Sequence, residues 1–158
     1  MNPCPCGAYP DLKKCTCTET MRRNYVNRLS KPLIDRMDIC LRVLRPESGE
    51  MINEIKEEPS DEVRCRVEKA HKIQEERYRG TGIYFNSQMR IEEIEKYCAL
   101  GDIEKSLMES AISKYDLSAR GYHRILRTAR TIADLDGGEV VTSKHLSEAL
   151  FFKSDILR

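Results

Sequence analysis

The sequence predicts a mainly α-helical protein in which a short mixed segment precedes a helical bundle. Apolar residues recur every three or four positions over most of the second half, between serine and glycine residues that commonly cap helices. Only residues 38–44 alternate with the two-residue period of a strand. Hydrophobic residues make up 40% of the 158 positions and charged residues 34%, a balance typical of soluble, helix-rich proteins.

The first helix is predicted between residues 18 and 29, where Thr18 can act as the N-cap and apolar residues return at helical spacing. Pro32 suits the first position of a short helical turn, because its missing N–H group would have no helical partner there. The turn leads into the predicted strand, whose apolar face holds Ile39, Leu41 and Val43.

A long, highly charged helix is predicted between Ser60 and Arg79, with Gly80 ending it. Its apolar stripe is thin, so we expect it to lie across other elements and not to be enclosed by them. A polar connection precedes this helix and contains Pro46, Ser48, Gly49 and Pro59.

Four better-patterned helices follow, and they predict a small helical bundle. Their apolar residues span positions 91–98, 103–115, 122–133 and 146–151; Ser118 can cap the third helix and Gly137 can end it. We therefore divide the chain into three parts. Residues 1–45 form the end of a mixed core with a cysteine-rich hairpin, 46–89 form a linker with the long helix, and 90–158 form a helical C-terminal domain.

Charge and composition exclude several classes of protein. The net charge of +1 is the difference between 27 basic and 26 acidic side chains, so no global field favours a polyanion. No apolar run approaches the roughly 20 residues that cross a bilayer, and the first residues lack the layout of a signal peptide. We expect a cytoplasmic protein without a membrane partner.

Four of the seven cysteines form two Cys-x-Cys pairs, eight residues apart, which can meet if the intervening loop folds back. As thiolates they could hold Zn²⁺ in a tetrahedral shell, although Cys-x2-Cys is the commoner spacing and four reduced, unligated thiols are the alternative. Either role is structural, because four thiolate ligands leave no open catalytic position. The four residues are Cys4, Cys6, Cys15 and Cys17.

Three polar residues are candidates for binding an anion. Asn2 precedes a proline, which favours an extended backbone, and its amide can orient a water or a phosphate oxygen, although a loop asparagine more commonly only marks a turn. Arg36 can project toward a phosphate or pair with Asp35 or Asp38. Arg120 lies one turn from a helix N-terminus, where a cation opposes the helix dipole unless an anion compensates.

The sequence shows no self-contained active site. It has no phosphate loop of the form Gly-x4-Gly-Lys-Ser/Thr and no His-Glu-x2-His metalloprotease motif. Its three histidines are far apart, at His71, His123 and His145.

Five motifs follow one another in a fixed order: Asn-Pro-Cys-Pro-Cys-Gly, Cys-x-Cys, Arg-Leu-Ser-x-Pro-Leu-Ile-Asp-Arg-Met-Asp-Ile, Asn-Ser-Gln-Met, and Leu-Ser-Ala-Arg-Gly-Tyr-His-Arg-Ile-Leu-Arg-Thr-Ala-Arg-Thr-Ile-Ala-Asp-Leu. In this order they resemble the C-terminal part of the magnesium-chelatase-like AAA+ ATPases of the ComM (YifB) family, from Met1 to about Ser154. The resemblance implies the end of an AAA+ α/β core, with the end of the sensor 1 strand and a short strand, followed by a helical lid bundle.

The resemblance also implies roles for the three anion-binding candidates. Asn2 would be sensor 1 and position the attacking water, Arg36 would be the arginine finger that reaches the ATP of a neighbouring subunit, and Arg120 would be sensor 2 on the lid. The phosphate loop and the magnesium-binding acidic strand of the family would lie upstream of Met1, so we expect these 158 residues to be inactive alone.

The whole family member is expected to use ATP and Mg²⁺ and to form a homo-oligomeric ring, which we expect to be a hexamer. It is also expected to remodel DNA as a branch-migration or helicase-type motor during recombination of incoming DNA. Arg22 and Arg23 on the first helix are the candidate nucleic-acid contacts. Two alternatives stay open at this point: a magnesium-chelatase-type ATPase subunit that drives metal insertion, and a stand-alone zinc-stapled helical adaptor.

Overall fold

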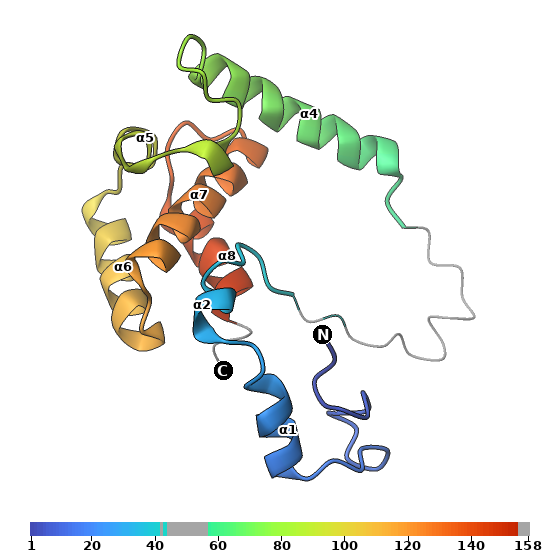
Figure 1. The fold of residues 1–158 in the computed structure, drawn as a ribbon. Coiled ribbons are helices and arrows are strands. Elements are labelled where there is room, and N and C mark those ends of the chain that lie inside the picture. The colour runs from blue at the N-terminus through green and yellow to red at the C-terminus, as the bar shows by residue number, and fades with distance from the viewer. Residues whose placement is uncertain (42, 44–56, 155–158) are drawn as a thin grey trace. The chain divides into compact units, whose positions relative to one another are not determined.

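The computed structural model describes residues 1–41, 43 and 57–154, and it confirms a mainly helical chain (Figure 1). The chain divides into two compact units, Met1–Met37 and Asp38–Arg158. The helices of the described residues are α1 (Glu19–Val26), α2 (Lys31–Ile34), α4 (Ser60–Arg77), the 3-10 helix η1 (Asn86–Gln88), α5 (Ile91–Tyr97), α6 (Asp102–Tyr115), α7 (Ala119–Leu135) and α8 (Ser143–Ser154).

The first unit consists of an N-terminal loop followed by α1 and α2. As predicted, Thr18 caps α1: its Oγ1 atom accepts a hydrogen bond of 3.2 Å from the backbone N–H of Met21. The helix ends at Val26, earlier than predicted, and none of its residues is buried. Pro32 lies in the first turn of α2, where a missing N–H costs no helical hydrogen bond.

The predicted strand is wrong for the residues that the structure describes. Residues 38–41 and 43 belong to no strand, while positions 42 and 44 and the connection with Pro46, Ser48 and Gly49 lie outside the described residues. A strand needs a neighbouring strand for its backbone hydrogen bonds, and the described part of the chain offers none. The N–H of Cys40 instead donates to the carbonyl of Phe152 over 2.8 Å.

Helix α7 forms the centre of the second unit. It contacts α4, α5, η1 and α8, and α6 packs on α8, so the predicted bundle is present (Figure 1). Burying each large aliphatic side chain stabilises the fold by roughly 1.5–3 kcal/mol. The buried apolar stripe of α7 consists of Ile125, Leu126, Ala129, Ile132 and Ala133.

The end of α7 is fixed by a left-handed glycine. Gly137 has a φ of 72°, its N–H donates to the carbonyl of Asp134 over 3.2 Å, and the N–H of Gly138 donates to the carbonyl of Ala133 over 2.7 Å. This pair of bonds is a Schellman motif, which satisfies two of the last helical carbonyls. The glycine predicted to end the helix, Gly137, therefore does so for a conformational reason.

Helix α4 is held against α7 mainly by polar contacts. Residues 60–69 are exposed, and the buried side begins only at Ala70. Near its end, Arg77 forms a two-pronged ion pair with the carboxylate of Asp134. The same carboxylate accepts hydrogen bonds from Asn86 Nδ2 at 2.8 Å and from Arg130 Nε at 3.0 Å. A buried network thus compensates for the thin apolar stripe of α4.

Among the described residues, no helix combines the length and the apolar character that crossing a membrane requires.

Candidate functional site

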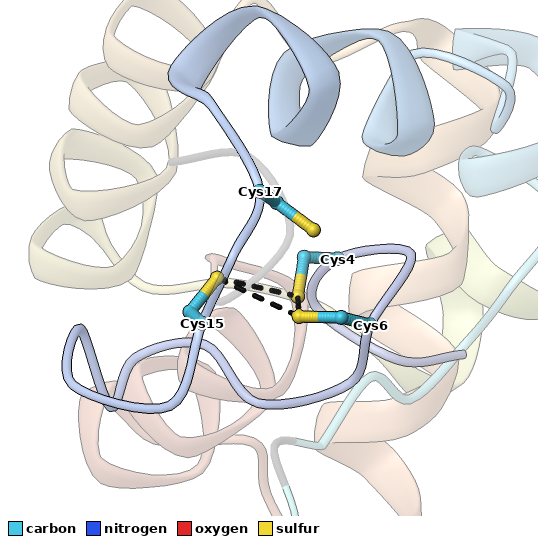
Figure 2. Close-up of side chains that lie close together, drawn as sticks. All are labelled: Cys4, Cys6, Cys15 and Cys17. Atoms are coloured by element: carbon cyan, nitrogen blue, oxygen red, sulfur yellow. Dashed lines mark hydrogen bonds between the residues drawn. The ribbon is translucent and has the colours of Figure 1, made fainter.

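The structure brings the two Cys-x-Cys pairs together at one place in the first unit (Figure 2). All four sulfur atoms lie within 4.8 Å of one another. The Sγ of Cys4 is 3.4 Å from that of Cys6 and 3.8 Å from that of Cys15, and the sulfurs of Cys6 and Cys15 are 3.7 Å apart. Cys4 and Cys17 are buried, whereas Cys6 is exposed.

Two tight turns create this arrangement. Gly7 adopts a φ of 76° and donates its N–H to the carbonyl of Cys4 over 3.1 Å, a left-handed turn that favours glycine. In the loop between the pairs, the carbonyl of Asp11 accepts the N–H of Cys15 over 2.8 Å, and its Oδ1 accepts the N–H of Lys13 over 3.0 Å. The Tyr9–Pro10 peptide bond in this loop is cis.

The thiols differ in how readily they ionise. A backbone hydrogen bond from Ala8, with further hydrogen bonds from neighbouring thiols and from Thr16, lowers the pKa of Cys6 to about 6. A backbone hydrogen bond at Cys6 favours the Cys17 thiolate, but burial and the nearby thiols outweigh it and raise the pKa of Cys17 to about 11. One thiolate in the cluster therefore disfavours ionisation of the next thiol.

Arg22, one of the two nucleic-acid candidates, is engaged with the cysteine loop. Its Nη1 donates to the carbonyl of Cys17 over 3.3 Å, and its guanidinium carbon lies 4.7 Å from the ring centroid of Tyr9. This packing ties α1 to the loop. The other candidate, Arg23, is exposed on α1.

The two nucleotide candidates of the first unit, Asn2 and Arg36, are both exposed. The amide of Asn2 lies beside Gly7, where an added Cβ would come within 3.3 Å of the Asn2 Nδ2 atom. Arg36 donates from Nη1 to the carbonyl of Pro32 over 2.8 Å, which keeps its side chain against the α2 turn. Asp38, considered as its ion-pair partner, pairs instead with Arg124, with Nη1 2.6 Å from Oδ1.

The third candidate, Arg120, is exposed on the first turn of α7. Ser118 caps this turn by accepting the N–H of Gly121 over 3.1 Å. Within the part of the chain that the structure describes, the side chain of Arg120 makes no hydrogen bond or ion pair. The next two arginines of the predicted stripe are engaged: Arg124 pairs with Asp38, and Arg127 donates to the carbonyl of Met89.

The candidates therefore fall into separate sites: the cysteine cluster, Asn2 and Arg36 belong to the first unit and Arg120 to the second. An open pocket of about 460 Å³ in the second unit, beside Tyr78, Arg79 and Ile83, contains none of them. Sequence reasoning missed the buried network around Asp134. Two features of the sequence could have indicated this network. Arg130 and Asp134 are four residues apart on an otherwise apolar helix face, and the Asn-Ser-Gln-Met motif contains Asn86, which is buried.

Residues 57–153 match the family model described as magnesium chelatase, subunit ChlI C-terminal, and residues 1–51 match magnesium chelatase, subunit ChlI. The competence protein ComM of Haemophilus influenzae is 40% identical over 155 residues, which cover 98% of this chain and 30% of that protein. The YifB proteins of Salmonella typhimurium and Escherichia coli are 35% and 34% identical over 156 residues, with the same 98% and 30% coverage.

The chain thus spans 30% of the length of these curated relatives. The C-terminal family model covers more than half of the chain and includes α4 to α7 and most of α8. With the second match covering the N-terminal residues, the resemblance inferred from the motifs is confirmed. The chain belongs to the magnesium-chelatase-like family and corresponds to the C-terminal, mainly helical part of such a protein.

Proposed function

We propose that this chain is the nucleotide-responding C-terminal portion of a ring-forming AAA+ ATPase of the ComM type. The observation that carries the proposal is the state of Arg120 within the Leu-Ser-Ala-Arg motif. Its side chain is exposed on a capped first helical turn and makes no hydrogen bond or ion pair with the residues that the structure describes, while the next two arginines of the same stripe are engaged. A guanidinium in that condition is available to an anion that comes from outside the described residues.

Phosphoryl transfer gives each of the three candidate residues a distinct task. The reaction needs a positioned nucleophile and cations that neutralise charge developing on the transferred phosphoryl group. Asn2 would orient the attacking water, Arg120 would contact phosphate from the helical lid, and Arg36 would reach the nucleotide of a neighbouring subunit. The sequence has no phosphate loop, so ATP and Mg²⁺ would bind in a longer protein that supplies one.

An arginine that acts in trans requires a neighbour, so we propose a cytoplasmic homo-oligomeric ring, with a hexamer as the working assembly. The similarity to a competence protein supports DNA as the substrate, remodelled by a branch-migration or helicase-type motor. Of the two basic candidates on α1, the exposed Arg23 is better placed to contact DNA than Arg22, whose guanidinium stacks on Tyr9. A chelatase-type subunit that drives metal insertion is the second candidate, favoured by the description of the matching family models.

The test is ATP hydrolysis by the full-length protein, measured as phosphate release. Arg36→Ala should lose hydrolysis and retain nucleotide binding, because the finger contributes to the transition state of the adjacent site. Arg120→Ala should lower both. Arg64→Ala, which removes an exposed arginine of α4, is the matched control and should leave both unchanged. The 158-residue chain by itself should not hydrolyse ATP.

Mixing two inactive variants separates action in trans from action within one subunit. An Arg36→Ala subunit keeps Asn2, and an Asn2→Ala neighbour keeps Arg36, so mixed rings contain some complete sites. Hydrolysis should therefore rise above that of either variant alone. No gain on mixing, in rings shown to exchange subunits, would remove the arginine-finger assignment.

A further inference from the structure

The four clustered cysteines have no task in the proposed nucleotide chemistry, and we infer that Cys4, Cys6, Cys15 and Cys17 hold one structural zinc ion. Thiolate sulfurs that surround a tetrahedral zinc at about 2.3 Å lie about 3.8 Å from one another. The separations of 3.4, 3.7 and 3.8 Å among the first three sulfurs agree with that value within a few tenths of an ångström. All four sulfurs lie within 4.8 Å of one another, so small side-chain movements complete the shell (Figure 2).

The four sulfur ligands and the distances between them indicate which metal the site can bind. Four soft thiolate ligands suit zinc or an iron–sulfur cluster, and they do not suit magnesium or calcium, which prefer oxygen. An iron–sulfur cluster places several irons and inorganic sulfides between its cysteines. A set of sulfurs within 4.8 Å of one another has room for a single ion. Four protein ligands also close the coordination sphere, which is the arrangement of structural and not of catalytic zinc sites.

Backbone hydrogen bonds hold the loop that carries the four cysteines. The N–H of Gly7 donates to the carbonyl of Cys4 over 3.1 Å, and the N–H of Cys15 donates to the carbonyl of Asp11 over 2.8 Å. Hydrogen bonds around a metal site keep its ligand residues in a fixed orientation. These two bonds fix the turn that follows Cys4 and the turn that precedes Cys15, so the loop itself holds the two pairs of cysteines close together.

The first unit has almost no apolar core, and a bound metal would stabilise it in place of one. Among residues 1–37, only Cys4, Cys17 and Ile34 are buried, and the first two belong to the cluster. A segment of this size cannot be ordered by so little apolar burial, and small domains of this kind commonly depend on a metal or disulfides. The zinc would fasten residues 4–17 into a hairpin, and Arg22 would join this hairpin to α1.

The inference is tested on the 158-residue chain, purified under reducing conditions without chelator and analysed for metals by mass spectrometry. The expected result is about one zinc per chain. Cys6→Ser and Cys17→Ser should lose the metal, whereas Cys65→Ser, which changes an exposed cysteine of α4, should keep it. Added Co²⁺ should give the visible absorption of a tetrahedral thiolate complex in the wild type and in Cys65→Ser only.

A second measurement covers the case in which the serine variants fold poorly. Zinc is removed from the wild-type chain by a strong chelator and then restored, and hydrogen–deuterium exchange is followed by peptide. Exchange over residues 1–29 should rise on removal and recover with Zn²⁺, while residues 91–153 should not change. Iron in place of zinc, zinc well below one per chain, or equal exchange with and without zinc would each overturn the inference.

Discussion

The two units of this chain are ordered by different means. In the second unit, α7 buries an apolar stripe between α5 and α8 and fixes α4 through a buried carboxylate. In the first unit α1 has no buried residue, and tight turns converge on four sulfur atoms. The free energy of unfolding of the second unit should therefore depend on apolar burial and on its internal ion pairs. The stability of the first unit should depend on its four cysteine thiols and on what they bind. Changes that act on one should leave the other unaffected.

The largest effect is expected from breaking the buried network of the second unit. Asp134→Ala removes the carboxylate that pairs with both Arg77 and Arg130. Because Arg130 is only 1% exposed, its charge would then lie buried without a counter-ion. Removing one partner of a buried ion pair costs on the order of 3–5 kcal/mol. Chemical denaturation followed by circular dichroism measures the loss.

Glu109→Ala is the control for Asp134→Ala, since Glu109 is an exposed carboxylate on α6. The free energy of unfolding should barely change in this variant. Equal costs for the two variants would show that the network does not hold α4 on α7. Zinc content should stay the same in both, because the first unit contains neither residue.

The cysteines of the two units give the next contrast. Burial raises the pKa of Cys98, in the core of the bundle, to about 11 from the ordinary value of 9.0. At pH 7 a thiol of ordinary pKa is ionised about 100-fold more than Cys98, which is also buried, whereas Cys6 is exposed. In chelator-treated chain, an alkylating reagent at pH 7 should therefore modify Cys6 and spare Cys98, as read by peptide mass spectrometry.

The raised pKa of Cys98 also has a consequence for stability. A group whose folded pKa lies above its unfolded value stabilises the fold below the unfolded pKa and loses that contribution as the pH rises. The bundle should therefore lose stability between about pH 9 and pH 11. Cys98→Ala removes this titration and should flatten the dependence. Rapid alkylation of Cys98 in the native chain would contradict its place in the core.

Much of the fold could be predicted from the sequence, because helix signals are local. Residues close together in the sequence are enough to predict the caps at Thr18 and Ser118, the glycine that ends α7 and the apolar stripe of α7. The predicted strand at Ile39–Val43 failed because alternation alone cannot supply a hydrogen-bonding partner, and the residues of its apolar face are exposed.

The candidate sites also contain some features that the sequence predicted and others that it did not. The spacing of two Cys-x-Cys pairs predicted a fold-back that the structure contains. Two ion pairs, Asp38 with Arg124 and Arg77 with Asp134, join residues that are 86 and 57 positions apart, so no local pattern indicates these two pairs. Arg120 was distinguished from its neighbours by its position near a helix N-terminus, and the structure adds that those neighbours are engaged.

The smallest effect comes from one substitution made once in each unit. Gly7 and Gly137 both have left-handed φ angles, of 76° and 72°, which cost any other residue roughly 1–2 kcal/mol. Around Gly137 no atom lies within 4 Å of an added Cβ, so Gly137→Ala should lower the unfolding free energy of the bundle by that backbone cost alone. Gly7→Ala adds a close contact with Asn2 at 3.3 Å, and the changed residue directly follows the sulfur ligand Cys6. The substitution should therefore weaken zinc binding in a competition with a chelator and leave bundle stability unchanged. Two outcomes would show that the two units are coupled: lower stability of the bundle in Gly7→Ala, or lower affinity for zinc in Gly137→Ala. Either outcome would contradict the contrast between a bundle stabilised by burial and a hairpin stabilised by its cysteines.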